Sequence, residues 1–104
     1  MEIAVIGGGH GCHAAAADLS ERGHRVRLWR RDREAFAPIL ARSALTLTDF
    51  QGTRDVSLEL ATTDLTQAVT GTELVLIPLP ATAQVVLGRE LAPLLTDGQV
   101  VFLP

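Results

Sequence analysis

The sequence feature that most constrains the fold is a change at residue 7, where a short apolar run gives way to glycines. Residues 3–6 read IAVI, residues 7–12 read GGGHGC, and four alanines follow at 14–17. A short run that is apolar throughout is typical of a strand buried on both faces of a parallel sheet. The apolar positions then recur with helical spacing, so we expect a helix from residue 10 to 22 that ends at Gly23. Its predicted inward face consists of Cys12, Ala15, Ala16 and Leu19.

The remainder of the chain alternates between strand patterns and helix patterns. Further apolar strands are predicted at 26–29, 60–62, 74–77 and 100–103, and further helices at 33–42, 65–70 and 81–95. Segments 44–48 and 55–60 flank a turn-rich link and predict a hairpin before the third core strand. This order is typical of the α/β class, and specifically of a Rossmann-type doubly wound parallel sheet with a β-hairpin insertion.

Local signals make the helix predictions more specific. Asp32 is the expected N-cap of the helix at 33–42. Pro38 lies inside this helix and predicts that it is kinked or starts late. Residues 64–67 read DLTQ, which predicts a capping box for a short helix that Gly71 ends. The helix at 81–95 is expected to turn four apolar side chains inward: Val86, Leu87, Leu91 and Leu94.

Segment 7–12, which we call the glycine loop, matches the dinucleotide-binding fingerprint G-x-G-x-x-G/A except at its last position. Gly7 would make the tight turn, Gly9 would let a pyrophosphate approach the backbone, and Cys12 occupies the third glycine's place. Because a cysteine is larger than glycine or alanine, the helix sits further out or the sulfur fills a gap. N–H groups at the helix start bind phosphates in such loops. The candidate pyrophosphate residues are Gly7, Gly9, His10, Gly11 and Cys12.

The end of the second predicted strand bears on cofactor choice. Proteins that prefer NAD usually place a carboxylate there to accept hydrogen bonds from the ribose, whereas this chain has Arg30 followed by Arg31. A guanidinium cannot accept a hydrogen bond, but its charge and fork geometry suit a 2′-phosphate. The sequence therefore favours NADP, with NAD as the second choice. Two alternatives remain open: Asp32 turns back to the ribose, or the arginines are simply solvated.

Two further groups of residues are candidates for ligand contact. Leu79, Pro80 and Thr82 follow the fourth predicted strand, where they would contact the nicotinamide side or form an ordinary connection. His10, Cys12 and His13 are spaced too tightly for an ordinary structural zinc site, and no metal is expected. A reactive Cys12 at a helix N-terminus is the alternative to a small buried packing residue.

Charge and composition narrow the choice of partners and compartment. The formal net charge is −3, which gives no case for binding nucleic acid. All nine basic residues are arginine, and six of them fall within residues 22–33, which suggests an anionic small ligand or a solvated basic turn. The longest uncharged run holds 15 residues and two prolines, so no membrane segment is expected. One cysteine allows no internal disulfide, and the expected location is cytoplasmic.

Several stretches resemble the octopine/opine dehydrogenase family, and the NAD(P)-dependent glycerol-3-phosphate dehydrogenases share much of this layout. The matching stretches are 4–14, 18–29, 62–65, 79–83, 91–95 and 97–101. The resemblance implies the N-terminal cofactor domain of an oxidoreductase that joins an amino acid to a keto acid by reducing their imine with NAD(P)H. His10 stands where the family has Asn, and Cys12 stands where it has its third glycine.

The family's catalytic residues lie in a following helical domain, so the resemblance implies cofactor contacts here and no catalytic residue. We therefore expect residues 1–104 to be an NAD(P)-binding domain without that catalytic domain. Two alternatives are a stand-alone NAD(P)-sensing regulatory module and a fragment of a glycerol-3-phosphate dehydrogenase. The expected partners are the dinucleotide and either a second copy of the chain or the missing domain, because an apolar sheet edge left uncovered tends to pair.

Overall fold

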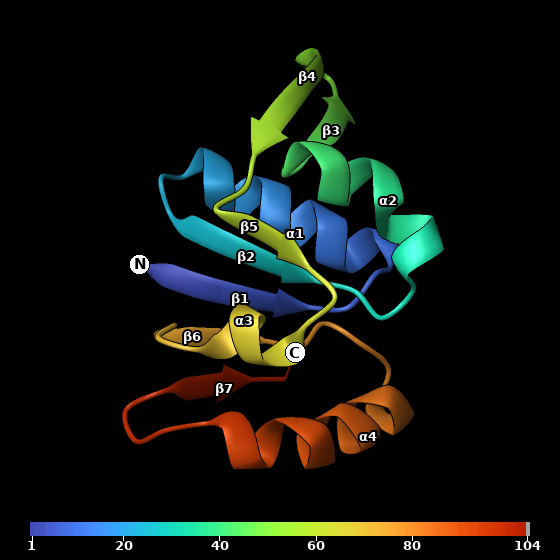
Figure 1. The fold of residues 1–104 in the computed structure, drawn as a ribbon. Helices are drawn as coiled ribbons and strands as arrows, with labels where there is room; N and C mark the ends of the chain where they lie inside the picture. Colours follow the sequence, from blue (N-terminus) through green and yellow to red (C-terminus); the bar gives the residue numbers. More distant parts are fainter. Residues whose placement is uncertain (104) are drawn as a thin grey trace.

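The computed structural model describes residues 1–103, except for the side chain of His10, and confirms the predicted fold class (Figure 1). In this part of the chain five parallel strands form the central sheet: β1 (Glu2–Ile6), β2 (Arg25–Trp29), β5 (Leu60–Thr62), β6 (Leu74–Leu76) and β7 (Val100–Phe102). Their spatial order is β5-β2-β1-β6-β7, the order 3-2-1-4-5 of a doubly wound sheet. Val5 of β1 pairs with Leu28 on one side and Leu76 on the other. The strand order reverses between β1 and β6, so ligands are expected outside the carboxyl ends of these strands.

Helices cover both faces of the sheet, and each face has its own apolar core. The helices are α1 (His10–Glu21), α2 (Arg33–Arg42), α3 (Leu65–Val69) and α4 (Ala81–Leu91), with the 3-10 turn η1 (Ala92–Leu94) after α4. Ile3 and Val5 of β1 belong to the core that includes α1, α2 and the hairpin. Ala4 and Ile6 belong to the opposite core, with α3 and α4. No helix in the described part of the chain has the length and apolar character needed to cross a membrane.

Helix α1 ends where the sequence predicted. Gly23 has a φ of +94°, its N–H donates to the carbonyl of Ser20 at 3.1 Å, and the N–H of His24 donates to Leu19 at 3.1 Å. These two bonds form a Schellman motif, in which glycine adopts the left-handed conformation without strain. Cys12 and Ala16 are buried as expected, but Ala17 is buried more deeply than Ala15, so the inward face is slightly rotated.

Helix α2 starts directly after Asp32, whose side chain accepts from the N–H of Ala35 at 3.2 Å. Of the two expected outcomes, a kink or a late start, the late start is wrong, because the helix begins at Arg33 and runs through Pro38. Proline removes the hydrogen bond to the carbonyl four residues earlier. Here that carbonyl belongs to Glu34. Because Glu34 and Pro38 are both exposed, water can donate a hydrogen bond to this carbonyl instead. Phe36 anchors the helix in the core.

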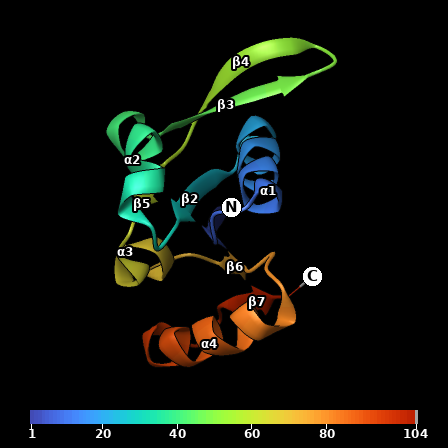
Figure 2. The same ribbon diagram turned by 90° about the vertical axis from the view of Figure 1, so that its right-hand side faces the viewer.

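The predicted hairpin is formed by β3 (Ala44–Asp49) and β4 (Gly52–Ser57), and it projects away from the sheet (Figure 2). The second hairpin strand was expected to run to residue 60, but it ends at Ser57. The reason is that the chain then crosses to the central sheet: Leu58 N–H donates to Ser43, and Glu59 N–H donates to Val26 at 2.9 Å. Leu45 and Val56 face the core on the α1 side.

Helix α3 has the predicted N-cap but only half of the predicted capping box. Asp64 accepts from the N–H groups of Thr66 and Gln67, at 2.9 and 3.4 Å. The side chain of Gln67 does not return to the cap; its Oε1 accepts from the hydroxyl of Thr62, which in turn accepts from the N–H of Asp64. Gly71, with a φ of +78°, follows the helix as expected.

The last helix differs from the prediction in length and orientation. It ends at Leu91 and continues only as the 3-10 turn, because Pro93 cannot donate the next helical hydrogen bond. Leu87 and Leu91 are buried, but Val86 is 57% exposed and does not point into the core. Strand β7 is also largely exposed, with Val100 at 60% and Phe102 at 54%. Helix α4 lies beside β7 at one edge of the molecule (Figure 2).

Candidate functional site

The glycine loop begins directly after β1, beside the point where the strand order reverses. The N–H of Gly7 donates to the carbonyl of Trp29 at 2.8 Å, so the loop leaves the sheet next to the end of β2. Gly7 has a φ of +135°, and a Cβ there would lie 2.7 Å from both Cys12 Sγ and Leu79 Cδ2. Backbone conformation and lack of space therefore both require glycine at this position.

Two other glycines of the glycine loop, Gly9 and Gly11, border open space. A Cβ at Gly9 or at Gly11 would meet no atom within 4 Å. Gly9 is the N-cap of α1, and its carbonyl accepts from Cys12 and His13, each at 3.1 Å. The first N–H groups of a helix have no carbonyl partner within the helix, so they are available to an anion. Within the described part of the chain, the loop thus combines helix-start N–H donors with room above them.

Cys12 lies behind the loop and not in front of it. Its side chain is fully buried, with Sγ 3.6 Å from the carbonyl of Pro78 and next to the space that Gly7 leaves empty. The predicted departure at the third glycine position is thus resolved by the sulfur filling a gap. Burial raises the pKa of the Cys12 thiol, and a hydrogen bond from Gly9 and the charge of Arg30 oppose that rise only in part. This favours a packing residue over a reactive thiol.

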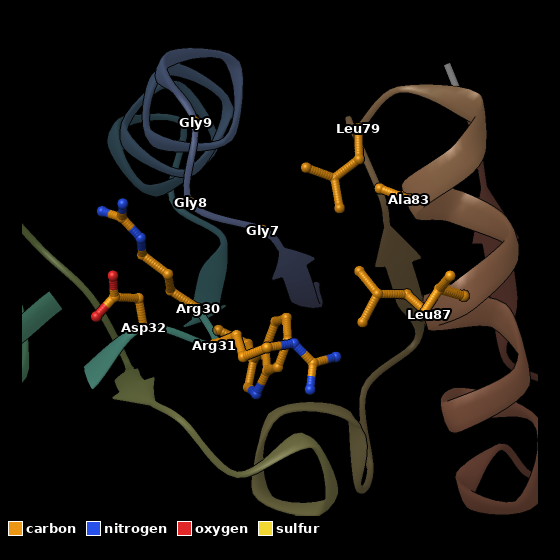
Figure 3. Close-up of a pocket in the computed structure, with 11 residues that line it drawn as sticks. Gly7, Gly8, Gly9, Arg30, Arg31, Asp32, Leu79, Ala83 and Leu87 are labelled. Atoms are coloured by element: carbon orange, nitrogen blue, oxygen red, sulfur yellow. The ribbon is translucent and has the colours of Figure 1, made fainter. Parts of the chain in front are cut away.

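A pocket of about 560 Å³ opens in front of the loop, between the end of β2 and helix α4 (Figure 3). Its lining residues are Gly7, Gly8, Gly9, Trp29, Arg30, Arg31, Asp32, Leu79, Ala83, Val86 and Leu87. The predicted residues that line it are Gly7, Gly9, Arg30, Arg31 and Leu79. Gly11, Cys12, Pro80 and Thr82 are not among its lining residues, and the side chain of His10 lies outside the described structure.

The sequence missed the wall that α4 contributes to this pocket. Val86 and Leu87 follow Ala83 by three and four residues, so all three lie toward one face of the helix. Val86 and Leu87 were predicted as part of a core-facing stripe, because an apolar wall of an open pocket and an apolar core give the same pattern. The sequence signal that could have indicated this wall was the spacing of Leu79, Ala83 and Val86, which are four and three residues apart.

Arg30 is the charged residue nearest to the loop. Its side chain lies across Gly8, where a Cβ would overlap its Cγ, Cδ and Nε atoms (Figure 3). Among the described residues no carboxylate lies within ion-pair distance of its guanidinium. The structure thus leaves an uncompensated positive charge beside the glycine loop.

Arg31 is held on the opposite side of the pocket. Its Nη2 lies 2.5 Å from Oε2 of Glu90 on α4, and its guanidinium carbon lies 5.3 Å from the centre of the Trp29 ring. Figure 3 shows the guanidinium directed toward Leu87. Trp29 is only 4% exposed, so it gives Arg31 a rigid aromatic surface.

Asp32 lines the pocket, but its carboxylate already has a structural role as the cap of α2. A turn back toward a ribose would cost that cap, which contributes about 1 kcal/mol in typical helices. This weighs against Asp32 as the ribose acceptor.

The six arginines of residues 22–33 do not form one positive surface, which corrects the single anionic-ligand site that their clustering suggested. Arg22 pairs with Asp18 at 3.1 Å, and Arg25 and Arg27 pair with Glu2 at the opposite end of the sheet. Arg33 donates to the hydroxyl of Thr63 at 3.1 Å. Only Arg30 and Arg31 line the pocket.

The loop after β6 supplies the remaining predicted contacts. Leu79 packs on the glycine loop, Pro80 is the N-cap of α4 and its carbonyl accepts from Gln84 N–H at 3.0 Å, and Thr82 is exposed in the first turn. In the described residues no group of three His, Cys, Asp or Glu side chains is arranged to hold a metal ion.

A glycine loop at the switch point of a 3-2-1-4-5 sheet, with an open pocket beside it, defines a dinucleotide-binding domain of the Rossmann class. Residues 2–103 match the family described as NAD-dependent glycerol-3-phosphate dehydrogenase N-terminus, and the chain belongs to this family. It is therefore a pyridine-nucleotide-binding domain of this family.

Individual relatives include both groups that the sequence resembles. The chain is 37% identical over 84 residues to a glycerol-3-phosphate dehydrogenase (NAD(P)+) of Thermoanaerobacter sp. (strain X514). The matched region covers 80% of this chain and 24% of the relative. It is 30% identical over 100 residues to an opine dehydrogenase of Arthrobacter sp. (strain 1C), which covers 96% of this chain and 28% of the relative. The chain thus spans about a quarter of the length of these relatives.

A solved structure of octopine dehydrogenase with NADH and L-arginine shares the fold. It superimposes with a TM-score of 0.79 at 23% identity, over 99% of this chain and 28% of the other.

Proposed function

We propose that this domain binds NADP(H) in preference to NAD(H), with the pyrophosphate over the glycine loop and the 2′-phosphate beside Arg30. The observation that carries the preference is the position of Arg30 at the end of β2, lying across Gly8 without a carboxylate partner among the described residues. A guanidinium in this state suits a phosphate, and it cannot accept from ribose hydroxyls.

The other predicted residues have distinct parts in this proposal. Gly7 makes the turn, Gly9 and Gly11 leave room for the pyrophosphate, and the N–H groups of Gly11 and His10 face it. Cys12 supports the loop from behind. These assignments are supported by the tight packing at Gly7 and by the open space at Gly9 and Gly11. A phosphate at the start of a helix also gains from the helix dipole.

Further along the crevice we assign Leu79, Pro80 and Thr82 to the nicotinamide side. They follow β6 at the edge of the sheet where ligands bind in this fold. Arg31 lines the adenosine end of the pocket. A bound dinucleotide would supply the hydride chemistry, and the residues assigned here would hold it in the crevice.

We propose that the complete enzyme carries its substrate pocket in a second, helical domain, as its relatives are three to four times longer than this chain. The first candidate reaction is reduction of an imine formed from an amino acid and a keto acid, supported by the identity to an opine dehydrogenase. The second candidate is the glycerol-3-phosphate reaction, supported by the family match and by the 37% identity. A stand-alone sensing role is the third. A cytoplasmic location fits the single, buried, unpaired cysteine.

Titration of the 104-residue chain tests the cofactor assignment. Trp29 is the only tryptophan and lines the pocket, so its fluorescence reports on ligands there. We expect saturable binding of NADPH and of 2′,5′-ADP, which carries the 2′-phosphate, and weaker binding of NADH and 5′-AMP. Absence of binding by all four ligands would contradict the proposal. Binding of AMP as tight as that of 2′,5′-ADP would contradict the role of Arg30.

A further inference from the structure

We propose that Glu90 limits the preference for NADP(H) by holding Arg31 away from the 2′-phosphate. The proposal rests on the proposed function, because it concerns how the same pocket chooses between two dinucleotides. It assigns a role in specificity to a residue of α4 that is far from the glycine loop in sequence.

The two arginines at the end of β2 differ in their partners. Arg30 has no carboxylate among the residues described, whereas Arg31 is paired with Glu90 at 2.5 Å and lies over the Trp29 ring. Only one of two adjacent positive charges is therefore free to meet a phosphate. The other is already neutralised.

Glu90 lies next to the face of α4 that lines the pocket, although it is not itself a lining residue. Ala83 and Leu87 line the pocket, and Glu90 follows Leu87 by three residues, close to the same side of the helix. The ion pair with Arg31 thus joins α4 to the end of β2 across one end of the pocket. A ligand that enters here meets both the pair and the half-buried side chain of Arg30.

The pair is exposed enough for a phosphate to compete with it. The side chain of Arg31 is 63% exposed and that of Glu90 is 40% exposed. Ion pairs exposed to this degree are weak, whereas a phosphate monoester carries close to two negative charges near neutral pH. NADPH therefore competes with Glu90 for Arg31, while NADH has no phosphate at this position and leaves the pair in place.

Glu90 thus acts on one cofactor and not on the other. It withholds the guanidinium of Arg31 from the 2′-phosphate of NADPH. Replacing it with glutamine frees Arg31, keeps a side chain of equal length and good helix propensity, and leaves the residues that contact the rest of the dinucleotide unchanged.

The test is a double-mutant cycle read out as the ratio of the dissociation constants for NADH and NADPH at low salt. The variants are Glu90→Gln, Arg31→Gln and the double substitution. Glu73→Gln is the matched control, because Glu73 is an exposed carboxylate beside the amino end of β6, with no ion-pair partner among the described residues. We expect Glu90→Gln to raise the ratio about threefold, as suits a partly screened pair.

The cycle separates an effect through Arg31 from a general effect of charge. We expect the rise to disappear when Arg31→Gln is already present, and Glu73→Gln to leave the ratio unchanged. An unchanged ratio in Glu90→Gln would overturn the proposal. So would an equal rise in Glu73→Gln, or a rise that persists without Arg31. If the native chain binds neither dinucleotide, it is the proposed function itself that has failed, and this inference fails with it.

Discussion

The side chain of Arg30 lies across Gly8, so that a methyl group on Gly8 would overlap three of the arginine's atoms. The absence of a side chain at the middle position of GGG is therefore what lets the arginine approach the loop. The fingerprint leaves this position open to any residue, so the contact gives Gly8 a role that the motif does not specify.

Gly8→Ala is expected to displace Arg30 and to leave the fold intact, because the overlapping atoms belong to a flexible side chain. Affinity for NADPH should fall about threefold to tenfold, which is the loss of part of one charge-assisted hydrogen bond, while affinity for NADH changes little. Gly88→Ala is the matched control, since a Cβ on that helical glycine meets no atom within 4 Å. Equal losses for both cofactors would show that Gly8 acts on the loop and not through Arg30.

Substitution of Gly9 should affect dinucleotide binding, whereas substitution of Gly7 should affect the stability of the fold. At Gly9 a Cβ meets only open space and φ is −78°, so Gly9→Val should fold normally but abolish dinucleotide binding by filling the place of the pyrophosphate. At Gly7 even alanine meets Cys12 and Leu79 and is strained by the positive φ, so Gly7→Ala should lower the free energy of unfolding by about 1–3 kcal/mol. Thermal melts and cofactor titrations of both variants check this. Unchanged affinity in Gly9→Val would contradict the assignment of the loop.

The course of the chain through the site was predictable because its signals are local. The turn at Gly7, the cap at Asp32 and the stop at Gly23 each depend on a few neighbouring residues, and the structure has all three. The alternation of apolar strand patterns with helix patterns extended this to the doubly wound parallel sheet, which the structure confirms.

The electrostatics of the site were not predictable in the same way, because they depend on residues that are distant in sequence. Arg31 and Glu90 are 59 positions apart, and no local pattern pairs them. The arginine cluster was misleading for the same reason: a strand carries Arg25 and Arg27 to the end of the sheet opposite to Arg30. Val86 was assigned to the core because periodicity does not distinguish a core from an open pocket.

Acid should loosen the hairpin from α1. Arg54 of β4 donates to Glu21 of α1 at 2.6 Å and to Asp49 of β3 at 3.0 Å. These hydrogen bonds hold the pKa of both carboxyls below their usual range. A carboxyl whose pKa is lowered in the folded state stabilises the fold at pH values above its ordinary pKa of about 4. This contribution to the free energy of unfolding is lost as the pH falls below that value.

The check is NMR of the β3–β4 amides between pH 7 and pH 3. We expect exchange protection to fall with pH in the native chain. In Arg54→Gln it should already be low at pH 7 and change little. Protection that is equal in both proteins at every pH would contradict a role for this network.

The exposed edge strand β7 should make the isolated chain self-associate. Val100, Phe102 and Leu103 are each more than half exposed on or beside an unpaired sheet edge. Such edges tend to pair with another chain, and a lysine on the edge opposes this. Sedimentation velocity at high concentration should show dimers or larger species in the native chain and fewer in Val100→Lys.

Phe50→Lys serves as the control for that experiment, since Phe50 is 94% exposed at the hairpin tip, far from this edge. A monomeric native chain, or dissociation by Phe50→Lys alone, would contradict an association through β7.

The central claim is that Arg30 makes this pocket prefer NADPH, and a side-by-side titration of both cofactors on the native chain and on Arg30→Asp tests it most directly. One charge-assisted hydrogen bond contributes about 1.5–3 kcal/mol, so NADPH should bind the native chain at least about tenfold more tightly at low salt. The gap should narrow as salt screens the pair. In Arg30→Asp the carboxylate repels the phosphate and accepts from the ribose, so the preference should reverse toward NADH. A native chain that prefers NADH, or a ratio that Arg30→Asp leaves unchanged, would contradict the account.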